Sequence, residues 1–301
     1  MIKHILILGA GGQLGSILSK SLWPNDYKIT ALTHAELDLN DRDALHRLFS
    51  EKGPFQAVLN TAVFMPVDQC EKFPEQAIET NGLSLLSLAQ ICKAQETLLV
   101  HFSTDYVFDG FKRTPYEETD LKNPLNVYGR SKYMGELILE SIKCPYFLIR
   151  SSWIFSHYGH NFVKKMWDWS FQDRTLTIVN DQIGCPTFAG DIVDAVQCVL
   201  LSYFNNPESF PFGTFHLCGK EETTWYDFAC FILEEIALRQ KTQLRLQPIS
   251  SKEYQSLTDG VADRPLYAAL NCQKIKNTFG ISQKEWKGAV KDVIKYLFQK
   301  N

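Results

Sequence analysis

Long uninterrupted apolar runs are absent from this 301-residue sequence, and their absence excludes a membrane-spanning helix. Such a helix needs about 18 or more apolar residues in a row. The apolar start of the chain ends at Gly9, too early for the hydrophobic region of a signal peptide. Repeats, low-complexity tracts and Gly/Ser-rich linkers are missing as well. We therefore expect a cytoplasmic protein that does not associate with a membrane.

An excess of charge of one sign is also lacking, which argues against nucleic acid as a partner. The 31 Lys and Arg residues and 34 Asp and Glu residues give a net charge of -3, so the chain has no general attraction to polyanions. The cysteines form no CxxC pair and no zinc-like spacing with histidine, and we expect them to be reduced, mostly buried and free of metal. They are Cys70, Cys92, Cys144, Cys185, Cys198, Cys218, Cys230 and Cys272.

The first half of the sequence does contain a regular alternation of β-rich runs and amphipathic helical stretches. Its first run, Ile5-Leu6-Ile7-Leu8, is apolar throughout, which is typical of a strand buried on both faces. The alternation predicts an α/β fold with a doubly wound parallel sheet of the Rossmann type. The expected strands are 5–8, 27–32, 56–60, 98–103 and 146–149, and the expected helices are 13–22, 41–51, 74–94 and 127–141.

A glycine-rich turn joins the first expected strand to the first expected helix. Its sequence is Gly9-Ala-Gly11-Gly12-Gln13-Leu14-Gly15. Glycines allow a tight turn and a close approach to a pyrophosphate, and the helix N-terminus offers free N–H groups. The order of strand, glycine turn and helix predicts a dinucleotide site, although a plain strand-to-helix turn has a similar pattern.

The second half is less regular, with expected strands at 176–179 and 214–217 and expected helices at 191–201, 225–239 and 283–300. We interpret residues 1–165 as a dinucleotide-binding domain, to which a segment of about 188–218 returns. Residues 166–301 would then form mainly a smaller C-terminal α/β lobe that binds the substrate.

The end of the second expected strand bears on which nicotinamide cofactor is bound. A carboxylate here usually binds the ribose 2′-hydroxyl of NAD and repels the 2′-phosphate of NADP. None occurs in Ala31-Leu32-Thr33-His34, and Thr33 with a protonated His34 would accept a phosphate. The sequence thus favours NADPH, with NADH as the alternative. Asp38, followed by Leu39, either reaches the adenine edge or caps the next helix.

Tyr128 and Lys132 are spaced i, i+4 at the start of an expected helix, so their side chains share one helix face. A nearby ammonium favours the phenolate and is expected to lower the pKa of the phenol from about 10. The phenol then suits a general acid that protonates an alkoxide. Thr104 follows the fourth expected strand, at the sheet edge where ligands bind in such folds, and its hydroxyl is placed to polarise a substrate oxygen.

The glycine turn, strand-end threonine and YxxxK pair together resemble the extended short-chain dehydrogenase/reductases. Within them, the resemblance is to the dTDP-4-dehydrorhamnose reductase family, and it spans nearly the whole chain. The segments that carry it are Gly12-Gln13-Leu14-Gly15, Val67-Asp-Gln-Cys-Glu71, Ser103-Thr-Asp-Tyr-Val-Phe-Asp-Gly110, Asn126-Val-Tyr-Gly-Arg-Ser-Lys132, Arg150-Ser-Ser-Trp153, Gly159-His-Asn-Phe162, Asn180-Asp-Gln-Ile-Gly-Cys-Pro-Thr187 and Arg264-Pro265.

This resemblance implies reduction of the C4 ketone of dTDP-4-dehydrorhamnose to dTDP-L-rhamnose by NAD(P)H, a step of dTDP-rhamnose biosynthesis for cell-surface polysaccharide. It implies that Tyr128 donates the proton, that Lys132 tunes Tyr128 and binds the nicotinamide ribose, and that Thr104 polarises the carbonyl. It further places Asp105 and Trp153 beside the sugar nucleotide. The residues that it places along the cofactor are Ala62, Val63, Phe64 and Phe102.

Three of the expected substrate contacts have structural alternatives. Trp153 is either a flat wall for the sugar or base, or part of the core. Gln182 either bonds to the substrate or belongs to a structural turn. Arg264 either pairs with the diphosphate or is a surface arginine. His101, His157, His160 and His216 have no catalytic partners in the sequence, and we interpret them as structural.

The sequence departs from the family at two places. Phe64 and Met65 stand where the family has small residues, which would narrow the pocket or change the accepted sugar. Leu266 and Tyr267 follow Arg264-Pro265, where small polar residues are common. The resemblance also implies a homodimer and, in some relatives, Mg²⁺ at the dimer contact, whose ligands we cannot place in this sequence.

Two other functions fit parts of the pattern. A sugar-nucleotide epimerase uses the same Tyr–Lys pair, whereas a dehydratase requires an Asp–Glu pair where this chain has Asp105-Tyr106. The regulatory subunit of methionine adenosyltransferase has the same kind of fold without catalysis. The presence of Thr104, Tyr128 and Lys132 together favours an enzyme.

Overall fold

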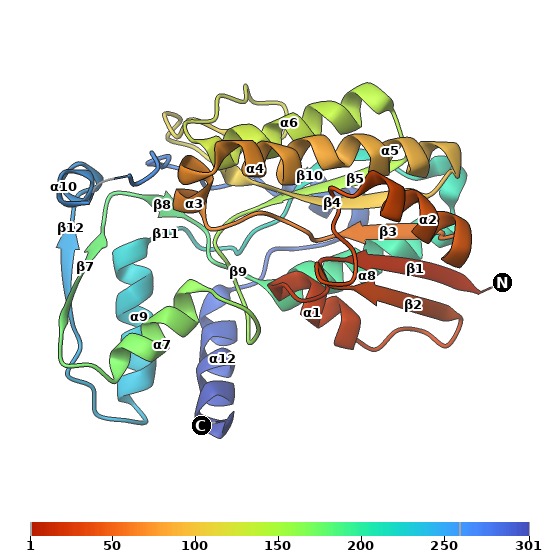
Figure 1. Cartoon of the computed structure of the whole chain (residues 1–301). Coiled ribbons are helices and arrows are strands. Elements are labelled where there is room, and N and C mark those ends of the chain that lie inside the picture. Colours follow the sequence, from red (N-terminus) through yellow and green to blue (C-terminus); the bar gives the residue numbers. More distant parts are fainter. Residues whose placement is uncertain (1, 259, 301) are drawn as a thin grey trace.

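The computed structural model describes residues 2–258 and 260–300, and within them a six-stranded, fully parallel sheet forms the centre of the molecule (Figure 1). The strand order is β2-β1-β3-β4-β5-β10. This confirms the predicted doubly wound α/β fold. The strands are β1 (Lys3–Leu8), β2 (Tyr27–Leu32), β3 (Ala57–Asn60), β4 (Leu98–Thr104), β5 (Tyr146–Ser151) and β10 (Gly213–His216).

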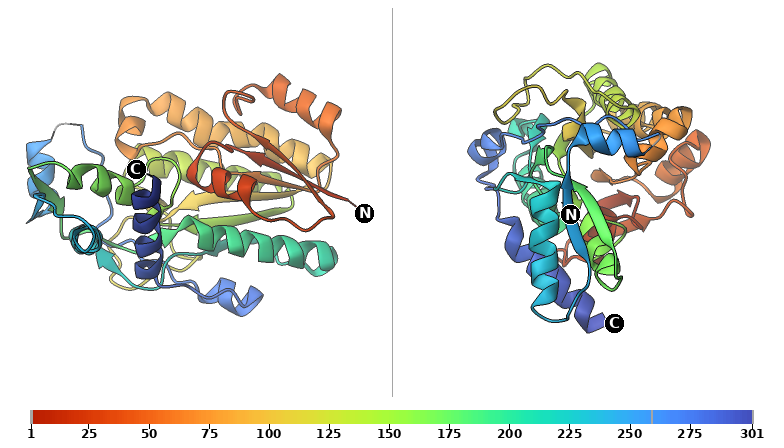
Figure 2. Two further views of the ribbon diagram at one scale, coloured as in Figure 1. Left: turned by 90° about the horizontal axis from the view of Figure 1, so that it is seen from below. Right: turned by 90° about the vertical axis from the view of Figure 1, so that its left-hand side faces the viewer.

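Helices cover both faces of the sheet, which explains why most of its central strand residues are apolar on both faces. In β1, Ile5 and Ile7 pack into the core on one face, and Leu6 and Leu8 pack into the core on the other. Successive strand residues point to opposite faces, so both sets must be apolar. One face carries α1 (Gln13–Lys20), α8 (Ala189–Asn205) and α11 (Gln273–Phe279), and the other carries α2 (Arg42–Lys52), α5 (Ser84–Ala94) and α6 (Val127–Ile142) (Figures 1 and 2).

The long helix predicted at 74–94 is interrupted. It consists of α4 (Pro74–Ile78), the π-helical turn η1 (Glu79–Leu83) and α5, and it follows a short helix that the sequence did not predict, α3 (Val67–Lys72). The π turn contains buried Asn81, whose amide bonds to the backbone N–H and carbonyl of Phe64 and to the Ser131 hydroxyl. Such π turns are frequent near functional sites, and this one fixes the segment after β3 against α6.

A smaller lobe lies beside the sheet, below and to the left in Figure 1, where the carboxyl ends of the strands point. Its own apolar core lies between its helices and a two-stranded parallel ribbon. The ribbon strand β12 was not predicted, because Pro248 and alternating exposed residues hide it in the sequence. The elements are α7 (Phe162–Ser170), β7 (Thr175–Val179), α9 (Trp225–Ala237), β12 (Arg245–Ile249), α10 (Ser251–Leu257) and α12 (Trp286–Lys300).

Short strands connect the sheet domain and the lobe. They form two small pairs, one parallel and one antiparallel. The parallel pair is β6 (Ile154–Phe155) with β9 (Thr187–Phe188), and the antiparallel pair is β8 (Ile183–Gly184) with β11 (Thr223–Thr224).

Candidate active site

The glycine turn lies where the strand order reverses, because β2 lies on one side of β1 and β3 on the other. Gly9 has φ +78°, and a Cβ on it would lie 2.6 Å from the backbone nitrogen of Ala62. A Cβ on Gly15 would clash with the carbonyl of Gly9. The N-cap of α1 is Gly12, which provides no side-chain cap, so backbone N–H groups of the first turn are not bonded to a capping side chain. This geometry fits a pyrophosphate.

Three further residues predicted to bind the cofactor have side chains with other partners. The Gln13 amide donates to the carbonyl of Ile154 and accepts from the Ser156 hydroxyl. Leu14 and Phe102 are each 8% exposed and belong to the core on the α1 side of the sheet. Leu14 therefore offers a ligand only its backbone, and Gln13 connects α1 to the loop after β6.

The sequence predicted no carboxylate at the end of β2, but the structure places one there. A turn brings Glu36 back to Thr33, and the carboxylate accepts from both the backbone N–H and the hydroxyl of Thr33 at 2.8 Å. These bonds lower the pKa of Glu36 and keep it ionised. The sequence interpretation stopped at His34 and missed this residue.

Asp38 and Leu39 have local roles at the same end of β2. The Asp38 carboxylate accepts from the backbone N–H of Asn40 at 2.9 Å, and its other close neighbour is the His34 ring, at 3.9 Å. Leu39 is 4% exposed and packs in the core on the α2 side. Asp38 does not cap α2, because Asp41 occupies that position.

The segment after β3 passes from the glycine turn to the catalytic helix. Ala62 packs against Gly9, Val63 is exposed, and Phe64 packs against a small apolar cluster that includes Tyr106 and Tyr128. Phe64 therefore lies close to Tyr128. Met65 is 53% exposed and does not belong to that cluster.

Thr104 ends β4, and Asp105 begins the 3₁₀ turn η2 (Asp105–Val107). The Thr104 hydroxyl donates to Oδ1 of Asp105 at 2.9 Å and accepts from the backbone N–H of Tyr106 at 3.1 Å. Burial raises the pKa of Asp105 to about 8. Among the described residues, no partner bonds to Oδ2 of Asp105, although this atom is buried.

Tyr128 and Lys132 lie in the first turns of α6, and both side chains are buried. The Asn126 side chain caps the helix by accepting from the Gly129 N–H at 2.7 Å. A Cβ on Gly129 would clash with the Tyr106 carbonyl, so this glycine lets α6 approach η2 closely. The helix start is thus fixed directly beside Thr104, and the Thr104 hydroxyl acts on Tyr128 through hydrogen bonding.

The expected lowering of the Tyr128 pKa by Lys132 is wrong for this structure. Burial raises the pKa of Tyr128 above its usual value, the charge of Asp105 adds to the increase, and hydrogen bonding with Thr104 only partly opposes it. Burial also lowers the pKa of Lys132 to about 8. A phenol with a raised pKa stays protonated at neutral pH, which is the form that a proton donor needs.

Behind the catalytic helix, the Glu136 carboxylate pairs with Arg150, and both side chains are 1% exposed. Arg150 donates through Nε at 2.9 Å and through Nη2 at 2.6 Å, and the Ser103 hydroxyl also donates to this carboxylate. Glu136 lies one helical turn after Lys132. The sequence interpretation missed this pair, although it quoted Arg150 in the family motif. The ion pair fixes α6 to strands β4 and β5.

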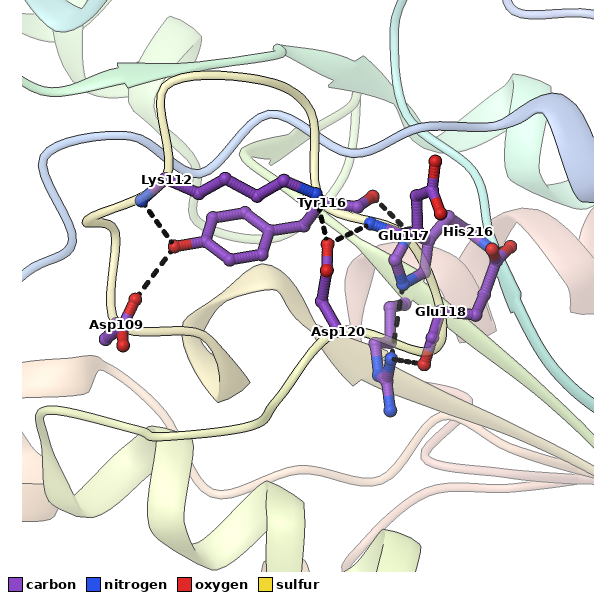
Figure 3. A network of polar contacts seen from close by, with 8 residues as sticks. Asp109, Lys112, Tyr116, Glu117, Glu118, Asp120 and His216 are labelled. Carbon is purple, nitrogen blue, oxygen red and sulfur yellow. Dashed lines mark hydrogen bonds and ion pairs between the residues drawn. The ribbon is translucent and has the colours of Figure 1, made fainter.

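Figure 3 shows how the loop before α6 joins this network. Arg150 donates to the Glu118 carbonyl and to Nε2 of His216, both at 3.2 Å. Burial and the Arg150 charge keep the pKa of His216 well below its usual value, so Nδ1–H of the neutral ring donates to the Tyr116 carbonyl. The Tyr116 hydroxyl donates to Asp109 at 2.8 Å. The loop is thus bound to β5 and β10.

Trp153 follows β5 with φ +44°, in the left-handed region. Its ring stacks on Trp225 with centroids 3.7 Å apart and an interplanar angle of 13°. A Cβ on Gly184 would lie 2.5 Å from Cε2 of the indole, so the glycine leaves space for the ring edge. The sequence interpretation did not identify Trp225, which lies 72 residues beyond Trp153 in the chain. The stacked pair presents Trp153 as a supported, partly exposed ring.

Gln182 and Arg264 have protein partners. The Gln182 amide donates to the Ser251 hydroxyl at 2.9 Å, and the side chain is buried. Arg264 donates to both oxygens of Asp68 at 2.8 and 3.0 Å. Its neighbour Asp263 accepts, through the backbone carbonyl, a hydrogen bond from the Asn126 amide. Arg264 therefore helps to hold the C-terminal part of the chain against the start of α6.

Residues 2–258 and 260–300 contain no cluster of three or more His, Cys, Asp and Glu side chains that could hold a metal ion. In the same residues no helix has the length and apolar character needed to cross a lipid bilayer.

A parallel sheet with a glycine turn at its reversal point, a threonine at the tip of β4, and a tyrosine and a lysine in the first turns of α6 has the pattern of a short-chain dehydrogenase/reductase-type enzyme. Comparison with known proteins narrows this class. The sequence profile described as RmlD substrate binding domain matches residues 3–298. The dTDP-4-dehydrorhamnose reductase of Aggregatibacter actinomycetemcomitans is 36% identical over 299 residues, which cover 98% of this chain and 99% of that protein.

Solved structures agree with the sequence comparison. A dTDP-4-dehydrorhamnose reductase from Clostridium acetobutylicum is 31% identical with a TM-score of 0.87, and it covers 98% of this chain and 99% of its own. One from Bacillus anthracis in complex with NADP is 28% identical with a TM-score of 0.85, and both chains are covered completely. The chain belongs to the dTDP-4-dehydrorhamnose reductase family.

Proposed function

We propose that this chain reduces the C4 ketone of dTDP-4-dehydrorhamnose to dTDP-L-rhamnose with a reduced nicotinamide cofactor. The observation that carries the proposal is the position of Tyr128 and Lys132 in the first turns of α6, beside the β4 end that bears Thr104, in a chain that matches these reductases over nearly its full length.

The residues of the site divide the work as follows. The glycine turn and the free N–H groups of α1 would hold the cofactor pyrophosphate, and Lys132 would hold the nicotinamide ribose. The cofactor supplies the hydride that adds to C4. Tyr128 donates its phenolic proton to the carbonyl oxygen, which thereby becomes the new hydroxyl. Thr104 would turn its hydroxyl hydrogen from Asp105 to the same oxygen, and Oδ2 of Asp105 would form a hydrogen bond with a sugar hydroxyl.

The direct test follows the absorbance of NADPH and of NADH while purified protein acts on dTDP-4-dehydrorhamnose. We expect one cofactor consumed for each sugar reduced. Cofactor that stays bound without net consumption would indicate an epimerase instead. A protein that consumes no cofactor with any nucleotide-linked 4-keto sugar would support a regulatory subunit and contradict the proposal.

Glu36 is expected to determine the choice between NADPH and NADH. The relative from Bacillus anthracis binds NADP, and we propose that this chain accepts NADPH as well. The ionised Glu36 carboxylate beside Thr33 disfavours a 2′-phosphate, because like charges repel. We expect Glu36→Gln to raise the ratio of kcat/KM for NADPH to kcat/KM for NADH by roughly tenfold at low salt, and less at high salt. Glu51→Gln, at the opposite end of α2, is the control, and an equal ratio in both variants would contradict the role of Glu36.

Gly184 is expected to set the position of Trp153. The Cβ of an alanine at this position would push the indole of Trp153 out of its stacked position on Trp225. An aromatic contact is worth about 0.5–1.5 kcal/mol, so we expect Gly184→Ala to raise KM for the nucleotide sugar roughly 2–12-fold and to change kcat little. Gly288→Ala is the matched control, because a Cβ there meets no atom within 4 Å. An unchanged KM in Gly184→Ala would show that Trp153 does not bind the substrate.

A further inference from the structure

A buried histidine contacts the lysine of the proposed site. His101 lies in β4, 1% exposed, and its Nε2 is 3.0 Å from Nζ of Lys132, which is 2% exposed. On the other side of the ring, Nδ1 is 3.3 Å from Nδ2 of Asn60 in β3, which is also buried. Lys132, His101 and Asn60 therefore form a continuous chain of hydrogen bonds from the catalytic helix into the sheet.

The backbone decides which way the Asn60 amide faces. Oδ1 of Asn60 accepts from the backbone N–H of Ala62 at 3.2 Å. A backbone N–H can only donate, so the amide oxygen must face Ala62 and the NH₂ group must face His101. Nδ1 of His101 then accepts a hydrogen bond and carries no hydrogen. The neutral imidazole therefore carries its hydrogen on Nε2, directed at Lys132.

This arrangement bears on the charge of Lys132. An ammonium has three donors and no acceptor, so it cannot form a hydrogen bond with Nε2–H. A neutral amine accepts from Nε2–H and completes the chain. The charged form instead requires the imidazole hydrogen on Nδ1 and the Asn60 amide turned, with the bond from the Ala62 N–H lost.

The other groups around the pair do not remove this constraint. Burial keeps the pKa of His101 well below its usual value, and the Lys132 charge lowers it further, so the ring is neutral. Glu136 is the acidic group that acts on Lys132, and it favours the ammonium. Its carboxylate is already paired with Arg150 and bonded to Ser103. Burial outweighs Glu136 at Lys132.

We propose that His101, oriented by Asn60, is a positioning residue that donates Nε2–H to the amine of Lys132 and allows Lys132 to gain a proton only when the imidazole hydrogen moves to Nδ1. The added proton comes from solvent and binds to Nζ. This proposal differs from the sequence interpretation of His101 as a structural residue. This inference rests on the proposed role of Lys132 in the reductase.

The first test needs no turnover. The ¹⁵N chemical shifts of ring-labelled protein without added cofactor, assigned by comparison with His101→Gln, report which ring nitrogen carries the hydrogen. We expect the Nε2–H tautomer for His101 above about pH 8, where Lys132 is a neutral amine. An Nδ1–H tautomer or a doubly protonated ring in this pH range would overturn the proposal, whether or not the enzyme is a reductase.

The second test is the pH profile of kcat/KM in two variants with different hydrogen bonding. In His101→Gln, the amide oxygen accepts a hydrogen bond from the Lys132 ammonium and thereby raises the pKa of Lys132. We therefore expect the alkaline limb of the kcat/KM profile to move up by about one pH unit. Phe fills the space without an acceptor, so its limb should move down as the charged form loses stability. His4→Gln, which changes another buried histidine bonded to Thr30 in β2, is the control and should not shift the limb.

A purely structural role would lower the plateau and leave the limb in place, and that result in both variants would overturn the proposal. The Lys132→Met variant separates the proposed role of Lys132 in the reductase from the proposed tautomer of His101. Full activity in that variant would refute the proposed role of Lys132 while the tautomer of His101 is still measured independently.

Discussion

Replacing Tyr128 with phenylalanine is expected to lower kcat by roughly 10²–10⁴-fold, the usual contribution of a positioned general acid. Phenylalanine keeps the ring that packs edge-on against Tyr106, with centroids 6.2 Å apart, and removes only the hydroxyl. Burial and Asp105 raise the pKa of this phenol, so it is protonated throughout the neutral range. The measurement is single-turnover oxidation of NADPH with saturating nucleotide sugar.

Tyr133→Phe is the matched control for this variant. Tyr133 lies on the same helix and packs against a different apolar cluster, the one that includes Phe108 and Tyr116. We expect kcat of the control to stay within about twofold of the parent. The exchange removes one hydroxyl away from the proposed site, and such substitutions usually have a small effect. If Tyr128→Phe reduced substrate as fast as the parent, the enzymatic interpretation of the site would fail.

Arg150→Met is expected to have the largest effect on stability, a loss of about 3–5 kcal/mol in the free energy of unfolding. The substitution leaves the Glu136 carboxylate buried without its counter-charge, and both side chains are only 1% exposed in the parent. It also removes the donors to Glu118 and His216 that hold the loop before α6. Urea denaturation followed by circular dichroism measures the loss.

Two further variants serve as controls for Arg150→Met. Arg245→Met breaks an ion pair with Asp173 whose side chains are more than 60% exposed, and such pairs contribute only about 0–1 kcal/mol. The double variant Glu136→Leu with Arg150→Met removes both charges, and we expect it to regain much of the lost stability. A single Arg150→Met variant as stable as Arg245→Met would contradict the role of the buried pair.

The sequence predicted the sheet and the catalytic helix because the relevant signals are local. Apolar strands, a glycine turn and a Tyr–Lys pair at i, i+4 are each contained in one short segment. The strand β12 was missed because its Pro248 and exposed residues do not resemble a buried strand. The π turn in the helix predicted at 74–94 was missed because helical stretches flank it on both sides, and its own buried residues, Asn81 and Gly82, give no apolar signal.

The partners of the site residues were harder to predict, because they come from distant parts of the chain. His101 lies 31 residues from Lys132, Trp225 stacks on Trp153 from another lobe, and Asp68 meets Arg264 across 196 residues. Such contacts depend on how the elements pack, which no single segment contains. Glu36 was the exception, since it lies within one turn of Thr33 and only the limits chosen for the end of β2 hid it.

The contact between Arg264 and Asp68 has a consequence for how ligands enter. The chain returns from the lobe at this point, and the Ala262 N–H and the Asn126 amide add two more bonds across the same junction. The sheet domain and the C-terminal lobe are thus joined close to the start of α6. A large hinge opening between them would break these hydrogen bonds, so we expect substrate to enter by local loop movements while the two parts stay together.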